Sequence, residues 1–383
     1  MTKKKSLINR IGIPRLIIGV FLLILFIAAP MAGVSLVDSI DNVLSRFGMF
    51  SVLVLSLVPM VQSGCGLNFG IPIGVVAGIL GGVTSIEFGF TGFKGIFIAM
   101  LFASLIAVVF GFFYGLLLNR IKGDEMLIAT YVGYSFTAFM CIAYLILPYK
   151  NPVSVLSYGG KGLSQQIPVA DYWMKSKILE DGTKVTVGVL NNFLSINILG
   201  VKIPMGMFLL FALMAFIVWA FFKTKTGTAM TAVGSNSEYA KASGIHINRV
   251  RLVSVILSTV IAAIGIVIYQ QSYGFIQLYQ APLSFTFQTV AALLIGGASI
   301  NKASIPNVIL GTALFHLMFI VLPQAGRVLT GDAMMGEYFR TFISYGVVTL
   351  ALILHAFERK RELEANRLKL REDRIAKGKK VAE

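Results

Sequence analysis

Charged side chains are scarce in this chain of 383 residues. Asp, Glu, Lys and Arg together make up 13% of it, while 56% of its residues are hydrophobic. Soluble domains of this size carry about 25% charged residues. Apolar runs of about 18 residues or more recur along the chain and do not alternate with polar residues, so the pattern predicts an all-α membrane protein and argues against a β-barrel.

Cysteine is almost absent too, and enzyme motifs are missing. The two cysteines, Cys65 and Cys141, lie in or beside apolar runs, which excludes a disulfide framework and a cysteine-based metal site. No P-loop, metalloprotease or serine-hydrolase motif occurs, and the glycine-rich run at residues 159–162 lacks the spacing of a phosphate-binding loop. We therefore predict a chain that is not an enzyme, holds no cofactor or metal, and binds no ATP through a P-loop of its own.

Acidic residues are missing from the predicted membrane spans. His316 is the only ionisable residue well inside one of them. Proton-coupled transporters commonly use a buried carboxylate or a histidine relay, so His316 is either such a group or a structural histidine bonded to a neighbour. We expect the energy for any transport to come from outside this chain.

About ten apolar segments form the predicted membrane domain, residues 1–357. The first is interpreted as a retained helix, because it is long and lacks a clear signal-peptide cleavage site. A charged cytoplasmic tail is expected over residues 358–383. The ten segments are residues 16–34, 48–61, 67–83, 95–118, 126–147, 204–222, 252–272, 285–300, 304–322 and 340–357.

The net charge of +16 is explained by topology and needs no nucleic-acid partner. Basic residues gather before the first span, in alternate loops and in the tail, which places both termini in the cytoplasm and the chain in the cytoplasmic membrane. Residues 148–203 then lie outside, either as a small insertion with a strand near residues 183–189 or as a mobile loop. The basic loop at residues 223–251 lies inside.

Two blocks of four spans run in opposite orientation around the sixth span, which predicts an inverted repeat. The third and eighth spans correspond in the two blocks, and both are short and rich in glycine. Such a pair points to the translocation path, although glycine packing between helices also accounts for the glycines. Amides and aromatic rings near these spans are the candidates for lining the path, unless the amides bridge helices. The candidates are Asn68, Phe69, Phe287 and Gln288.

The loop at residues 223–251 has the composition of a docking site for a soluble partner. Its sequence over residues 226–266, TGTAMTAVGSNSEYAKASGIHINRVRLVSVILSTVIAAIGI, resembles the cytoplasmic loop and following span of bacterial ABC importer permeases. The most similar group is the ribose and simple-sugar permeases, whose relatives move nucleosides and branched-chain amino acids. Residues 290–315 also resemble that family. The chain departs from the family pattern at Asn68-Phe69-Gly70 and at Ser284-Phe285.

The resemblance implies a half-transporter that imports a small polar solute, with a simple sugar as the first candidate and a nucleoside as the second. Its partners would be cytoplasmic ABC ATPase subunits, an extracytoplasmic solute-binding protein and a second permease chain, identical or different. A secondary transporter or channel remains the alternative class. The residues expected to couple to the ATPase are Gly234, Ser235, Asn236, Glu238, Ala240, Lys241, Gly244 and Ile245.

Overall fold

The computed structural model describes residues 35–353 except for short gaps. The predicted first span at residues 16–34 and the charged tail at 358–383 lie outside the described residues, as does part of the predicted last span. The gaps are residues 122, 157–161, 179–183, 333, 339, 343–344, 347–348 and 350–352.

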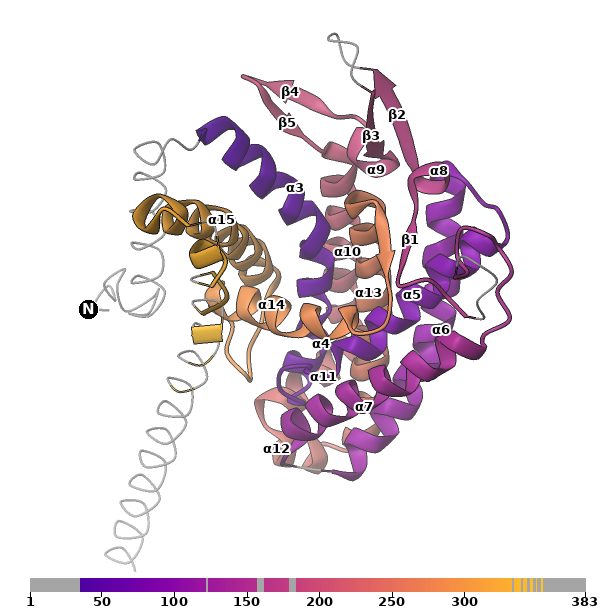
Figure 1. Cartoon of the computed structure of the whole chain (residues 1–383). Coiled ribbons are helices and arrows are strands. Elements are labelled where there is room, and N and C mark those ends of the chain that lie inside the picture. Colours follow the sequence, from indigo (N-terminus) through magenta and orange to yellow (C-terminus); the bar gives the residue numbers. More distant parts are fainter. Residues whose placement is uncertain are drawn as a thin grey trace, which may run out of the picture.

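Long apolar helices dominate the described part of the chain (Figure 1). Six of them are long and apolar enough to cross a membrane, and two shorter apolar helices accompany them. The predicted all-α membrane fold is confirmed, while the count of ten spans and the inverted repeat stay predictions. The six are α3 (Leu36–Leu55) continued by α4 (Leu57–Gln62), α6 (Gly92–Arg120), α7 (Glu125–Ile146), α10 (Met205–Phe222), α13 (Ile247–Tyr273) and α15 (Ile305–Thr330).

The two shorter apolar helices are α5 (Ile71–Glu87) and α14 (Ala281–Ile295). They coincide with the third and eighth predicted spans, the two that the sequence marks as short. The predicted start of the third span is wrong, because residues 67–70 form a turn and α5 begins at Ile71 with Pro72 in its first turn. Proline lacks an N–H group and fits the first turn of a helix, where that group has no partner.

The second predicted span is too short. Helix α3 begins at Leu36, twelve residues before the predicted start at residue 48. Ser35 caps it, because its side-chain oxygen accepts the backbone N–H of Asp38 at 3.3 Å. Polar residues early in this helix hide its apolar periodicity. Asp38 and Asp41 therefore lie within a helix rather than in a loop.

The connections between helices gather at two opposite ends of the molecule. At one end, Gln62 donates a hydrogen bond to the carbonyl of Ala303. At the other end, strand β1 (Gln166–Pro168) pairs with β6 (Phe275–Gln277), and Glu87 accepts hydrogen bonds from two backbone N–H groups that follow α7, at 2.9 and 3.0 Å. These contacts match the two groups of loops that the charge pattern predicts.

The predicted insertion at residues 148–203 has a fold of its own in its described part, at the top of Figure 1. The strand expected near residues 183–189 is β3 (Lys184–Gly188), which pairs antiparallel with β2 (Met174–Ile178). Trp173 anchors the insertion as one of the largest fully buried side chains. The remaining elements are α8 (Ala170–Trp173), α9 (Val189–Asn192), β4 (Ile196–Ile198) and β5 (Val201–Ile203).

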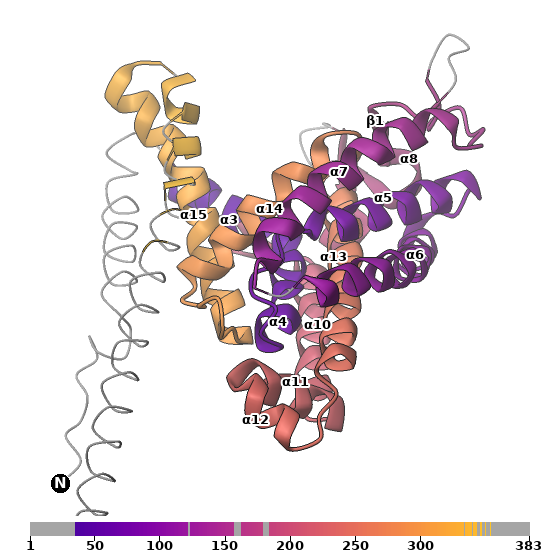
Figure 2. The same cartoon turned by 90° about the horizontal axis from the view of Figure 1, so that it is seen from below.

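Helix α13 is the central helix of the fold and packs against α3, α5 and α6. Figure 2 shows these helices around it in a view from below. Small residues allow α5 to approach α13 closely. A Cβ atom on Gly74 would lie 2.7 Å from that of Ala262 and 2.8 Å from the carbonyl oxygen of Thr259, so the two backbones would have to separate to accommodate a side chain.

We expect Gly74→Val to destabilise the fold by about 1–3 kcal/mol, because overpacking forces side chains and backbone out of place. The measurement is the thermal unfolding midpoint of the purified protein in detergent. Gly346→Val is the matched control, since a Cβ there meets no atom within 4 Å. Equal midpoints for the two variants would contradict the close packing of α5 on α13.

Candidate functional site

Two short helices interrupt the membrane helices between α10 and α13. They are α11 (Lys225–Ser235) and α12 (Ser237–Ala242), and they project at the bottom of Figure 1. Each begins at a capping side chain: Thr224 accepts the N–H of Gly227 at 3.2 Å, and Asn236 accepts that of Tyr239 at 3.0 Å. These caps satisfy N–H groups that have no partner inside the helix.

Helix α12 ends in a left-handed glycine. Gly244 has φ +81°, its N–H bonds to the carbonyl of Lys241, and the N–H of Ile245 bonds to that of Ala240, both at 3.0 Å. This is a Schellman motif, which favours glycine because other residues are strained at positive φ. The chain therefore turns sharply after α12 and enters α13 three residues later.

A small apolar cluster holds α11 and α12 against the start of α13. Met230 and Val233 of α11, Ala240 of α12 and Val250 of α13 are buried together, with Ile245 packed against them. The pair of short helices therefore forms a unit with a core of its own. We call residues 224–246 the docking unit.

The eight residues predicted to couple to an ATPase divide into two groups. Ala240 is buried, Ile245 packs on the small core, and Gly234 is half-buried against the backbone of Gln62 and Gly64. These three support the unit from within. The exposed ones are Ser235, Asn236, Glu238, Lys241 and Gly244.

Tyr239 lies on the same exposed side, with 71% of its surface accessible. The sequence prediction omits it, although an aromatic residue inside a polar amphipathic stretch is a recognisable signal for an interface. Tyr239 joins the exposed face of the docking unit.

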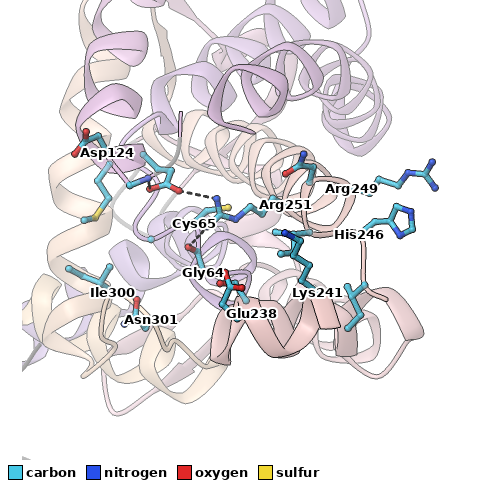
Figure 3. A pocket seen from close by; sticks show the side chains of 18 of the residues that line it. Gly64, Cys65, Asp124, Glu238, Lys241, His246, Arg249, Arg251, Ile300 and Asn301 are labelled. Carbon is cyan, nitrogen blue, oxygen red and sulfur yellow. Dashed lines mark hydrogen bonds and ion pairs between the residues drawn. The ribbon is translucent and has the colours of Figure 1, made fainter. Parts of the chain in front are cut away.

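A cavity of about 1120 Å³ lies beside the docking unit (Figure 3). The turn before α5, the start of α7, the docking unit and the connection after α14 all contribute to its wall. Basic and acidic side chains both face it, including Lys241, Arg249, Asp124 and Glu238. Such a mixed polar wall is typical of a surface that receives a protein partner.

Arg251 links three segments at the back of this cavity. Its Nη1 lies 2.9 Å from Oε1 of Glu125, and its Nη2 donates to the carbonyl of Gly64 at 3.2 Å. The two side chains are only 14% and 13% exposed. The other carboxylate oxygen of Glu125 accepts the N–H of Gly123 at 3.0 Å, while the buried Nε of Arg251 has no hydrogen-bond partner among the described residues. A shielded pair of this kind depends strongly on both partners.

The docking unit also touches the turn that precedes α5. A Cβ atom on Gly64, which has φ +73°, would lie 3.1 Å from the Cα of Gly234. Ser63 and Ser254 share a hydrogen bond of 2.7 Å. Burial raises the pKa of the Cys65 thiol in the same turn. The docking unit therefore packs directly on the turn at the start of the short helix α5.

Asn68, a predicted path residue, is 1% exposed and fully bonded within the protein. Its Nδ2 donates to Ser258 at 2.9 Å, and its Oδ1 accepts from Tyr114 at 3.0 Å and from the N–H of Gly70 at 2.9 Å. The amide therefore connects the turn before α5 to α6 and α13. This geometry favours the alternative that Asn68 bridges helices.

The other three path candidates lie closer to one another. The rings of Phe69 and Phe287 meet edge to face, with centroids 6.2 Å apart. Gln288 follows on α14, is partly buried, and makes no hydrogen bond within the described part of the chain. The structure therefore brings Phe69 and Phe287 together at the contact between the turn before α5 and helix α14, and leaves the amide of the neighbouring Gln288 without a hydrogen bond among the described residues.

We expect Asn68→Leu to lower the thermal unfolding midpoint, because each buried polar group that loses its partner costs about 1–3 kcal/mol. Tyr114→Phe is the matched control and should cost less, since Asn68 keeps its bonds to Ser258 and Gly70. An unchanged midpoint for Asn68→Leu, together with lost uptake, would instead place Asn68 in the path.

Comparison with known proteins identifies a family for this chain. A family model described as branched-chain amino acid transport system / permease component matches residues 39–354. The chain is 26% identical, over 43% of its length, to the probable ABC transporter permease protein YphD of Escherichia coli strain K12. It is 28% identical, over 43%, to the autoinducer 2 import system permease protein LsrC of Shigella flexneri.

A third relative is the nucleoside ABC transporter permease protein NupB of Lactococcus lactis, 29% identical over 38% of the chain. The aligned segments span 48%, 45% and 36% of these three relatives, so the chain matches about half of their length or less. A solved structure of an ABC transporter in an inward-facing conformation aligns with a TM-score of 0.43 and 11% identity, covering 88% of this chain and 98% of that one.

Proposed function

The chain belongs to the branched-chain amino acid transport system / permease component family, and we propose that it forms the membrane pathway of an ATP-driven importer. The family membership confirms the resemblance carried by residues 226–266. It also agrees with the prediction that the chain is not an enzyme, because the relatives are named as permease proteins.

The observation that carries the proposal is the docking unit and its attachment. It exposes a polar face with one large aromatic residue, Tyr239. Behind this face, Arg251 and the contact between Gly234 and Gly64 join the unit to the turn before α5. A protein that only conducts a solute has no need of such a unit, whereas one that is moved by a soluble partner does.

The partner is an ABC ATPase subunit on the cytoplasmic side. Exposed residues of the docking unit enter a cleft on the ATPase, with Glu238 and Lys241 as polar contacts and Tyr239 as the apolar one. Gly234, Ala240 and Ile245 hold these residues in place. ATP-driven closure of two ATPase subunits would rock the helices and open the path alternately to each side.

Two permease chains, identical or different, form the pathway in the bacterial cytoplasmic membrane, and an extracytoplasmic protein delivers the solute. The end that carries the docking unit faces the cytoplasm, as do both termini, and the insertion at residues 148–203 faces outside. The basic residues of the docking-unit end support this orientation.

A simple sugar is the first candidate for the solute and a nucleoside is the second. The residues that the chain shares with sugar permeases favour the first. The relative named as a nucleoside permease favours the second, and the rings of Phe69 and Phe287 suit stacking on a base or on the apolar face of a sugar.

We expect Gly244→Arg to reduce uptake about 10-fold or more, because it places a bulky charge in the centre of the docking face, where contacts carry most of the binding energy. The measurements are uptake by cells and co-purification of the ATPase. Gly331→Arg is the matched control: Gly331 also ends a helix at positive φ, +75° against +81°, and has no atom within 4 Å of a Cβ.

Gly331 follows the last residue of α15, a helix of 26 residues that is about 39 Å long. The helix begins at the end of the molecule that carries the docking unit, so Gly331 lies far from that unit. Both variants therefore carry similar backbone strain, and only one alters the docking face. Loss of uptake in both, or in neither, would contradict the assignment of the docking unit.

Deleting the cognate ATPase separates the two classes of transporter. We expect solute uptake through this chain to stop in the deletion strain and to return with a plasmid copy of the ATPase. A catalytically inactive ATPase with its Walker B glutamate replaced by glutamine is the control, since it keeps the assembly but not the hydrolysis. Continued uptake without the ATPase would show a secondary transporter or channel.

A further inference from the structure

Helix α3 carries an arginine inside a stretch that is long and apolar enough to cross a membrane, where a charge is costly. Arg46 lies ten residues after the start of the helix at Leu36, which is about 15 Å along its axis. The predicted second span begins at residue 48 and leaves Arg46 out. Its guanidinium makes no hydrogen bond or ion pair within the part of the chain that the structure describes. Ionisable residues inside membrane segments generally mark functional sites.

A second arginine lies beside it, over the same aromatic ring. The Cζ atom of Arg46 lies 4.8 Å from the centroid of the Phe319 ring, and that of Arg340 lies 4.0 Å from it. Both distances are within the range of cation–π attraction. Arg340 also pairs with Glu337 at 2.5 Å. Two guanidinium groups therefore approach one ring, an arrangement that is suited to an anion.

Aromatic rings surround the cluster. Phe50 contacts His316 and Tyr269, with ring centroids 4.4 and 5.2 Å apart, and Tyr269 packs edge to face on Phe285 at 4.9 Å. The rings come from α3, α13, α14 and α15. Helix α15 packs against both α3 and α14, and α13 packs against α3, as Figure 2 also shows.

Buried polar groups without partners lie on the same helices. His316 is 1% exposed, and neither ring nitrogen has a hydrogen-bond partner among the described residues. The hydroxyls of Ser51, Thr286 and Thr312 are buried and unpartnered too. Thr312 lies one helical turn from His316 on the same face of α15. Native proteins leave few such groups unsatisfied, and each needs an explanation.

We propose that the junction of α3, α13, α14 and α15 binds the oxyanion of a small solute, a carboxylate or phosphate held by Arg46 and Arg340. The inference rests on the proposed function and adds to it that the sugar or nucleoside carries an acidic group, a carboxylate or a phosphate, in place of the neutral solute considered above. Guanidinium groups bind such oxyanions in forked, charge-assisted pairs. His316 and the hydroxyls bond the remaining polar atoms, and Phe50 and Tyr269 cover the apolar face.

A transported solute fits this site better than a lipid headgroup. His316 is shielded from the surface by Phe50, Phe315 and Phe319, whose rings surround it. Helix α14 contributes Phe285, which is buried, to the same cluster of rings. His316 therefore lies among the helices rather than on the lipid-facing side.

The test uses the purified full-length chain in detergent, with ribose, ribose 5-phosphate and ribonate as probes. Binding is measured by titration calorimetry. We expect the two anions to bind at least about 10-fold more tightly than ribose, and Arg46→Gln to weaken their binding by about 10- to 100-fold. Arg327→Gln is the matched control, because Arg327 is exposed in the last turn of α15. Equal affinities for the three probes, or an unaffected Arg46→Gln variant, would overturn the proposal.

A second variant and a lipid titration complete the test. If Arg46→Gln does not fold, Arg46→Lys is tested in its place. This variant keeps the positive charge but cannot form the forked pair of hydrogen bonds, so we expect its affinity for the two anions to fall by about 3- to 10-fold. Titration with phosphatidylglycerol distinguishes a lipid phosphate. Binding of this lipid that depends on Arg46, without binding of either anionic sugar, would overturn the proposal in favour of a lipid site.

Uptake by cells separates this inference from the proposed function. Uptake that needs the ATPase but shows no preference for the anionic probes overturns the oxyanion site and leaves the importer intact. Binding of the anions that depends on Arg46, combined with uptake that continues without the ATPase, overturns the importer and leaves the site. Uptake that depends on the ATPase and is selective for the anions supports both proposals.

Discussion

The bonds of Arg251 hold together three segments at the end of the molecule that carries the docking unit. Its guanidinium joins the start of α13 to Glu125 at the start of α7 and to Gly64 in the turn before α5. Both side chains are largely shielded from water, where an ion pair is strong and the loss of one partner is costly. The docking unit rests on the same turn through Gly234. Under the proposed function, these contacts are the route by which a movement of the docking unit would reach the short helix α5.

Much of this fold can be predicted from the sequence, because membrane helices are specified by long apolar runs and their ends by local residues. Residues 223–251 stand out as a polar interruption, and Asn236 marks the start of α12 by its capping chemistry. The two short helices α5 and α14 fall in the segments predicted as short and glycine-rich, although the glycines of the second segment, Gly296 and Gly297, follow α14. The strand near residues 183–189 follows from its local pattern. Each of these features depends on neighbours in the chain.

The rest depends on contacts between distant residues. The sequence shows that Ala240 and Glu238 lie on one short helix, but only packing against Met230 and Val250 decides that Ala240 points inward. Asn68 has the chemistry of a solute ligand, yet Ser258 and Tyr114, which occupy its amide, lie 190 and 46 residues away. Arg46 falls outside the predicted span because polar residues at the start of α3 hide the helix. Strand β1 pairs with β6, which lies more than a hundred residues later in the chain.

In the account proposed here, the docking unit receives force from the ATPase and the oxyanion site recognises the solute. The most direct test is amide hydrogen exchange of residues 62–70 in the complex with the cognate ATPase, with and without ATP. The account predicts that ATP changes exchange there as well as in residues 235–245, and that Arg251→Gln abolishes the change at 62–70 only. A change confined to residues 235–245 in the unaltered protein would contradict the account.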